Sequence, residues 1–297
     1  MTLKILHVSD IHIRKLKYHT EYREVFAQLY EKAAAEKPDI ILNTGDTFHT
    51  KTDLSSEAVQ MMSELFSNLA DIAPFHMILG NHDMNLRSLG RLDAISPVVD
   101  NLNHPNIHFH KYSDVISLTD DIDMHILSIV DPDNWTKTPN KKKTNIAVYH
   151  GSVKGVKTDM GWAMEHGDID ISELNKYDFA LLGDIHKTNQ MVNSNPRFRY
   201  PGSLVQQNHG ETNDKGFIVW EIENKDSYGV RHCVLENPKP FVTIILTKTG
   251  RLPKNAKVKD GARLRLVSNA NISLDAMRRA VDIARHRFNP ESVSFLS

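Results

Sequence analysis

Short apolar runs alternate with amphipathic stretches along the first third of the chain. Apolar residues recur at every third or fourth position in residues 21–36 and 56–70, and this period predicts two helices. Residues 3–8, 39–43 and 75–79 are instead short and mainly apolar, as expected of strands buried on both faces. Strands that alternate with helices favour an α/β fold, in which helices cover a sheet.

The middle of the chain is predicted to be richer in strands, which two long loops interrupt. The loops cover residues 131–144 and 151–170, and long ordered loops in a compact domain are often functional. The candidate strands are residues 107–109, 115–118, 124–130, 145–149, 179–182, 198–200, 217–221 and 231–235.

A domain boundary is predicted near residues 236–240, where the sequence NPKP breaks the pattern. Beyond it, the pattern predicts three strands and one helix, which suffice for a small α+β domain. We therefore expect a large domain over residues 1–236 and a small one over residues 237–297. The predicted elements of the small domain are strands 241–246, 263–267 and 292–296 and helix 274–287.

Composition restricts the classes of partner and compartment. The formal net charge of the 297 residues is −1, so a nucleic acid would have to meet a local basic patch. Cys233 is the only cysteine, which excludes an internal disulfide and a thiolate zinc cage. The N-terminus becomes polar too early for a secretory signal, and no apolar run reaches the roughly 18 residues of a membrane span. We expect a cytoplasmic protein, in the host cytoplasm if the source is viral, without a membrane partner.

Polar clusters follow five of the predicted strands directly. Strand ends at one edge of a sheet converge, and ligand sites form in the crevice there. The 16 histidines are many for this length, and carboxylate, imidazole and carboxamide groups without thiolates suit a pair of divalent ions such as Mn²⁺, Fe²⁺ or Zn²⁺. The five clusters are Asp10-Ile11-His12, Gly45-Asp46-Thr47-Phe48-His49, Gly80-Asn81-His82-Asp83, His150-Gly151 and Gly183-Asp184-Ile185-His186.

Each cluster taken alone also has a structural explanation. Asp10 and His12 could cap a helix or stand in a loop, Gly45-Asp46 is a turn signal, and His150 alone would be an ordinary structural histidine. The order and placement of all five clusters together favour the metal site.

The series DxH, GDxxH, GNHD, H and GxxH resembles the calcineurin-like metallophosphoesterase superfamily. Within it, Gly45–His49 and the sequence Tyr200-Pro201-Gly202-Ser203-Leu204 resemble the SbcD-type nuclease subunit of double-strand-break repair complexes, including its phage versions. The resemblance covers residues 3 to about 236. It implies an αββα sandwich, with two packed mixed sheets flanked by helices, and a small C-terminal cap domain that binds DNA.

The resemblance also implies a role for each cluster. Two divalent ions, Mn²⁺ or else Mg²⁺, would share Asp46 as a bridge. His82 would act on the phosphate without binding metal, and His49 would position the nucleotide. From its adjacency in the sequence, we further expect the Asp83 carboxylate to orient the His82 imidazole. The ligands of one ion would be Asp10, His12, Asp46 and His186, and those of the other Asp46, Asn81, His150 and Asp184.

One position departs from the family pattern, which commonly has His-x-His where this chain has Asp184-Ile185-His186. A carboxylate in place of an imidazole adds negative charge. It therefore favours a harder ion, Mn²⁺ or Mg²⁺, over Zn²⁺.

The implied activity is metal-dependent cleavage of DNA, as an exonuclease or endonuclease, in recombination, repair and replication. Implied partners are DNA, an SbcC-like ATPase subunit and a second copy of the chain. Trp135 or Trp162 could stack on a base, although a lone loop tryptophan more often packs on its own domain. Candidate contacts to DNA phosphates are Arg14, Lys15, Lys17, Arg87 and Arg91.

Two alternatives remain open at this stage. A metallophosphatase or nucleotide phosphodiesterase of the same superfamily would use the same ions, although the GDxxDRG and GNHE motifs of protein phosphatases are not matched here. A non-catalytic scaffold that binds DNA ends is the other alternative, and the full set of ligand residues argues against it.

Overall fold

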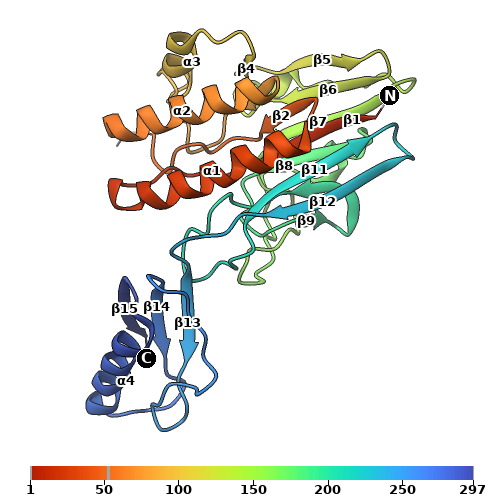
Figure 1. Ribbon diagram of the computed structural model, residues 1–297. Helices are drawn as coiled ribbons and strands as arrows, with labels where there is room; N and C mark the ends of the chain where they lie inside the picture. Colours follow the sequence, from red (N-terminus) through yellow and green to blue (C-terminus); the bar gives the residue numbers. More distant parts are fainter. Residues whose placement is uncertain (1, 52–53, 297) are drawn as a thin grey trace. The chain divides into compact units, whose positions relative to one another are not determined.

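The structure is a computed structural model that describes residues 2–51 and 54–296 (Figure 1). It divides into two compact units. The first comprises the chain up to Val205 together with Asp214–Leu235, and the second comprises Gln206–Asn213 and the chain from Glu236 onward. Among the described residues, no helix is both long and apolar enough to cross a lipid bilayer.

The first unit contains two six-stranded mixed sheets. The first sheet has the order β12-β11-β1-β2-β3-β4, with β1 to β4 parallel and the other two strands antiparallel to their neighbours. Its strands are β1 (Leu3–Val8), β2 (Ile40–Asn43), β3 (Phe75–Ile78), β4 (Ile107–His110), β11 (Gly216–Ile222) and β12 (Tyr228–Val234).

The second sheet has the order β5-β6-β7-β8-β10-β9. Strands β6, β7, β8 and β10 run parallel, and the edge strands β5 and β9 run antiparallel to their neighbours. Its strands are β5 (Asp114–Thr119), β6 (Ile122–Leu127), β7 (Thr144–His150), β8 (Phe179–Gly183), β9 (Gln190–Val192) and β10 (Asn195–Tyr200).

A continuous apolar core joins the two sheets. Leu42 and Trp220 from the first sheet pack with Ile146 and Phe179 from the second, and all four are fully buried. Each such side chain contributes roughly 1.5–3 kcal/mol by leaving water. The predicted α/β class with two packed mixed sheets is confirmed.

Helices α1 (His19–Glu36), α2 (Ser56–Ile72) and α3 (Ser96–Leu102) pack on the outer face of the first sheet, where α1 and α2 lie side by side (Figure 1). The N-terminus of α2 is capped by the Ser55 side chain, which accepts a hydrogen bond from the Ala58 amide. The outer face of the second sheet is covered largely by residues 151–177. Three short 3-10 helices complete the unit: η1 (Leu16–Tyr18), η2 (Pro132–Asn134) and η3 (Ile171–Glu173).

The second unit is a parallel three-stranded sheet with one helix. Strands β13 (Phe241–Ile245), β14 (Arg263–Val267) and β15 (Ser292–Leu296) are covered by α4 (Leu274–Phe288). The Gln206 side chain accepts from the Phe241 amide at 2.9 Å and donates to the Phe241 carbonyl at 3.0 Å. These bonds attach Gln206–Asn213 to the second unit, whereas the sequence pattern had placed this segment in the first domain.

Candidate metal centre

The polar clusters that follow the strands gather at one end of the first unit. The sequence pattern placed all five clusters at the edge of a single sheet. In the structure the clusters follow strands of both packed sheets. Strands β1, β2 and β3 of the first sheet supply three clusters, and β7 and β8 of the second supply two. The side chains involved are Asp10, His12, Asp46, Asn81, His82, His150, Asp184 and His186.

Four of these residues have a left-handed backbone. The φ angles are +50° at Asp10, +48° at His12, +55° at Asp46 and +98° at Asp184. Side chains other than glycine rarely adopt this region, and each instance costs on the order of 1–3 kcal/mol. The backbone turns at Asp10 and His12, and both side chains lie in one pocket. Strain of this kind is typical of functional sites.

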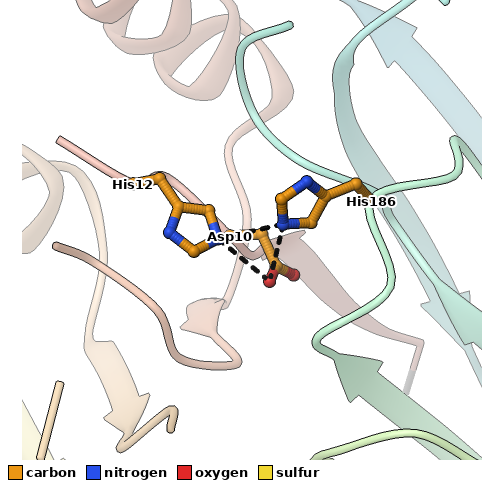
Figure 2. Close-up of side chains that lie close together, drawn as sticks. All are labelled: Asp10, His12 and His186. Carbon is orange, nitrogen blue, oxygen red and sulfur yellow. Dashed lines mark hydrogen bonds and ion pairs between the residues drawn. The ribbon is translucent and has the colours of Figure 1, made fainter. Parts of the chain in front are cut away.

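The first group of ligand atoms lies around His12 (Figure 2). His12 Nε2 is 2.9 Å from His186 Nε2 and 3.7 Å from Asp10 Oδ1, and His186 Nε2 is 3.8 Å from Asp10 Oδ1. Asp46 Oδ2 lies 3.5 Å from His12 Nε2. Asp10 and His12 are buried. The spacing of the ligand atoms of Asp10, His12 and His186 suits a single cation between them.

The second group lies around His150. Its Nε2 is 3.4 Å from Asp46 Oδ1 and 3.9 Å from Asp184 Oδ1, and the Asn81 amide nitrogen is 3.1 Å from the same Asp184 oxygen. The Asn81 side chain would have to turn its amide over to present oxygen to an ion. Asp46 therefore directs one oxygen toward each group, which is the position of a bridging ligand.

The hydrogen bonds of His150 test whether these residues fit a cation. His150 Nδ1 lies 2.7 Å from the Thr44 carbonyl oxygen, which can only accept, so Nδ1 carries the proton. Nε2 is then buried without a hydrogen-bond partner among the described residues, and it faces the carboxylates of Asp46 and Asp184. Burial lowers the pKa of His150, but Asp46 and Asp10 outweigh it and raise this pKa well above the usual value. The pocket thus favours positive charge at Nε2.

The crowded carboxylates of the site also favour the binding of cations. Burial raises the pKa of Asp184 to about 6, with further contributions from Asp10 and Asp46, although His150 opposes them. Burial and Asp46 raise the pKa of Asp83 to about 7 against the effect of its backbone donors. Divalent cations offset this excess of negative charge, and the oxygen and imidazole donors are suitable ligands for them. The site fits two divalent ions, held by the two groups described above.

Glycines make room for the ligand loops. A Cβ at Gly80 would come within 2.1 Å of Asp46 Oδ1. Gly45 has φ +100°, and a Cβ there would lie 2.7 Å from His150 Nδ1. Larger residues at either position would therefore displace a ligand.

The prediction that Asp83 orients the His82 imidazole is wrong. The Asp83 carboxylate is buried beneath the ligand loops and accepts four backbone N–H groups, at distances of 2.9–3.2 Å. The His82 ring is instead held by its Nδ1, which donates to the His49 carbonyl at 2.7 Å. Asp83 thus fixes the backbone around Asp46. The four donors are the amides of Asp46, Thr47, Phe48 and Gly80.

His82 and His49 lie at the mouth of the site. The His82 ring packs edge-on against His12, with centroids 4.9 Å apart, and stacks against His49 at 6.0 Å. Burial, followed by the proximity of His12 and Arg14, lowers the pKa of His49 to about 4. Both rings line a cavity of about 570 Å³, together with Asn81.

The basic candidates differ in their positions. Arg87 lines the 570 Å³ cavity, and Arg14 and Lys15 line a neighbouring cavity of about 150 Å³ beside His49. Lys17 lies 4.9 Å from the Tyr18 ring, with Arg14 at 4.8 Å from the same ring. The exposed Arg91 lines neither cavity.

Two lysines near the site were missed from the sequence. Lys51 lines the larger cavity and donates to the Asn81 carbonyl at 3.0 Å, and its position two residues after His49 could have indicated it. Lys215 is buried, and its Nζ lies 2.6 Å from the His186 carbonyl and 3.1 Å from Asp159 Oδ2. No motif marks Lys215, because its two partners come from distant loops.

Comparison with known proteins extends these observations. The family model of calcineurin-like phosphoesterases matches residues 3–188. An uncharacterized protein, R555, of Acanthamoeba polyphaga mimivirus is 38% identical over 237 residues, which is 75% of this chain and 18% of that protein. The DNA double-strand break repair protein Mre11 of Saccharolobus solfataricus is 28% identical over 203 residues, which is 62% of this chain and 49% of that protein.

A solved structure of a dimetal phosphatase from Danio rerio aligns with a TM-score of 0.48 and 10% identity, over 79% of this chain and 99% of that one. The chain spans about half the length of the archaeal Mre11 protein and less than a fifth of the mimivirus protein. The family match covers more than half of the chain and includes all the strands that carry metal ligands. This chain therefore belongs to the calcineurin-like phosphoesterase family and carries its His/Asp dimetal site.

Proposed function

We propose that this chain is a nuclease subunit that hydrolyses phosphodiester bonds in DNA, with Mn²⁺ as its preferred ion. The observation that carries the proposal is the position of Asp46 between two cation groups, beside a cavity lined by basic side chains. Two archaeal proteins named Mre11 align with 62% of the chain, which supports DNA as the substrate. Asp184, an oxygen ligand in place of an imidazole, supports Mn²⁺.

The chain's own residues fit the steps of such a hydrolysis. When bound, the two ions would activate a water molecule for attack and offset charge on the phosphate oxygens. His82 is held through Nδ1, so its Nε2 is available to stabilise the phosphate or to protonate the leaving oxygen. His49 lines the same cavity and would position the nucleotide. Lys51 and Arg87 would hold phosphates along it.

The proposal includes two protein partners and a cytoplasmic location. The sequence contains no Gly-rich phosphate loop with a Lys-Ser/Thr ending, so an SbcC-like ATPase subunit would supply ATP hydrolysis. A second copy would pair through the segment after Asn85, where Leu86, Leu89 and Leu92 are 42%, 50% and 78% exposed. A wild-type chain that stays monomeric at micromolar concentration in light scattering would contradict this pairing.

A nuclease assay tests the proposed activity. Duplex DNA labelled at the 5′ or 3′ end is incubated with Mn²⁺, Mg²⁺ or a chelator, and a chromogenic phosphomonoester is run in parallel. We expect cleavage of DNA that needs Mn²⁺, and we expect His82→Ala to lose cleavage by roughly 100-fold or more while it keeps its metal content. Efficient hydrolysis of the monoester without DNA cleavage would instead identify a phosphatase. Loss of metal from His82→Ala would make His82 a ligand.

A further inference from the structure

A third cavity lies beside the His150 group and has no role in the proposal above. Its volume is about 250 Å³, and Asn81 and His150 form the wall nearest the metal centre. A molecule whose phosphate reaches the ions could therefore extend into it. The remaining walls are mostly apolar and include Ile129, Pro132, Trp135 and Ile169.

Tyr149 places a hydrogen-bond donor in this cavity. The residue lines the cavity and is only 3% exposed. Its hydroxyl lies close to Gly151, where a Cβ would come within 2.3 Å of the oxygen, and Gly151 lines the same cavity. Within residues 2–51 and 54–296, no group hydrogen bonds to this hydroxyl. A phenol keeps its proton at neutral pH, so it can donate to an acceptor that enters the cavity.

Trp135 forms a rigid aromatic wall. Its indole N–H donates to the Ser128 carbonyl at 2.8 Å, so the polar edge of the ring is already satisfied. The ring packs edge-on against Tyr149, with centroids 5.3 Å apart and planes at 73°. These two contacts fix the orientation of the indole. Trp135 is half-buried, and it lines the cavity. Such a fixed ring suits stacking by a flat heterocycle.

Asp168 adds an acceptor at the rim of the cavity. Its Oδ2 accepts from the Ser152 amide at 2.8 Å and from the Ser152 hydroxyl at 2.7 Å. These two bonds hold the exposed carboxylate in place, and its Oδ1 remains available to a ligand. The cavity therefore offers a flat apolar wall, one donor and one acceptor, which together match the face and edge of a nucleobase.

We propose that this cavity is a subsite for the base of the nucleotide whose phosphate lies at the metal centre. The inference rests on the proposed function, because it takes the substrate to be a nucleotide. The base would stack against Trp135, accept a hydrogen bond from Tyr149 and donate an amino group to Asp168. A base in this subsite has left the duplex stack, so unpaired ends should be cut faster than blunt ends.

Binding experiments test the subsite without any hydrolysis of DNA. The full chain with Mn²⁺ is titrated with dAMP, dCMP and 2-deoxyribose 5-phosphate, which carries the same phosphate without a base. Stacking of one base on an aromatic side chain predicts that the two nucleotides bind at least about fivefold more tightly than the sugar phosphate. Trp135→Ala should remove most of this preference.

Two further variants make the result interpretable. Trp162→Ala changes the other tryptophan considered for base stacking, which is 72% exposed on the 151–170 loop and does not line this cavity, so it should keep the preference. Tyr149→Phe removes only the hydroxyl and should weaken binding of the nucleotides but not of the sugar phosphate, so the test does not depend on the folding of Trp135→Ala. Equal affinity of the wild type for nucleotide and sugar phosphate would overturn the subsite, as would an unchanged preference in Trp135→Ala.

The two proposals fail in different ways. A chain that prefers base-bearing phosphates but never cuts DNA would refute the nuclease and support the subsite. A chain that cuts DNA but binds nucleotide and sugar phosphate alike would refute the subsite and leave the nuclease intact.

Discussion

Three histidines on one face of the first sheet predict a loss of stability at mildly acid pH. His76 on β3 stacks with His108 and His110 of β4, with ring centroids 4.6 and 5.2 Å apart. His76 is 7% exposed, and its Nδ1 lies 3.0 Å from His110 Nε2. Burial, then the proximity of His110 and His108, lowers the pKa of His76 to about 3. Burial, then His108, lowers that of His110 to about 4.

The sign and size of the effect follow from these pKa values. An imidazole in the unfolded chain titrates near pH 6.5, so between that pH and the folded pKa the unfolded state binds more protons. The two neutral imidazoles therefore stabilise the folded state fully above about pH 6.5. This stabilisation is lost as the pH falls below that value. At pH 5 each of His76 and His110 would lower the free energy of unfolding by about 2 kcal/mol. This value is 1.36 kcal/mol for each unit over the roughly 1.5 units between pH 6.5 and pH 5.

Urea denaturation at pH 7.5 and pH 5, with a chelator present, measures this loss. His76→Phe keeps an aromatic ring but cannot take up a proton, and it also relieves His110. We expect the free energy of unfolding of the wild type to fall by at least about 2 kcal/mol more than that of the variant between the two pH values. The control His166→Phe, at an exposed position, should follow the wild type. Equal losses in the wild type and His76→Phe would refute the reasoning.

Two further predictions concern residues that hold the metal loops. Asp83→Ala leaves four buried N–H groups without their acceptor. At about 1 kcal/mol for each group, this loss should lower the Tm of thermal unfolding by about 6 °C. An unchanged Tm would contradict the role of Asp83. Lys215→Met releases the His186 carbonyl and leaves Asp159 without this cation, so Mn²⁺ affinity in calorimetry should fall roughly tenfold. Unaltered affinity would show that Lys215 only supports the fold.

The elements that could be predicted from the sequence are those with a long or strongly apolar pattern. Strands β1, β14 and β15 begin and end at the predicted residues, because each is an apolar or alternating run between polar or turn-forming neighbours. Helix α3 has only seven residues and β9 only three, which is too short for a period to be visible. Both were missed for that reason.

The metal residues could be proposed from sequence because each follows an apolar strand, and the structure brings them together. Their geometry could not be foreseen. Local spacing does not reveal that His150 donates to Thr44, or that the Asp46 oxygens diverge toward two groups. Asp83 was misassigned because adjacency in sequence suggested contact with His82, whereas its side chain turns beneath the loop. The Lys215–Asp159 pair joins residues 56 positions apart, and no pattern encodes it.

Metal content tests the central claim most directly. The claim is that Asp46 stands between two divalent ions, so the wild type and Asp46→Ala are each dialysed against Mn²⁺ and analysed by mass spectrometry, with circular dichroism to verify folding. The account predicts two ions per wild-type chain and the loss of both from the folded variant. A wild type that binds one ion or none, or a variant that keeps two, would contradict it.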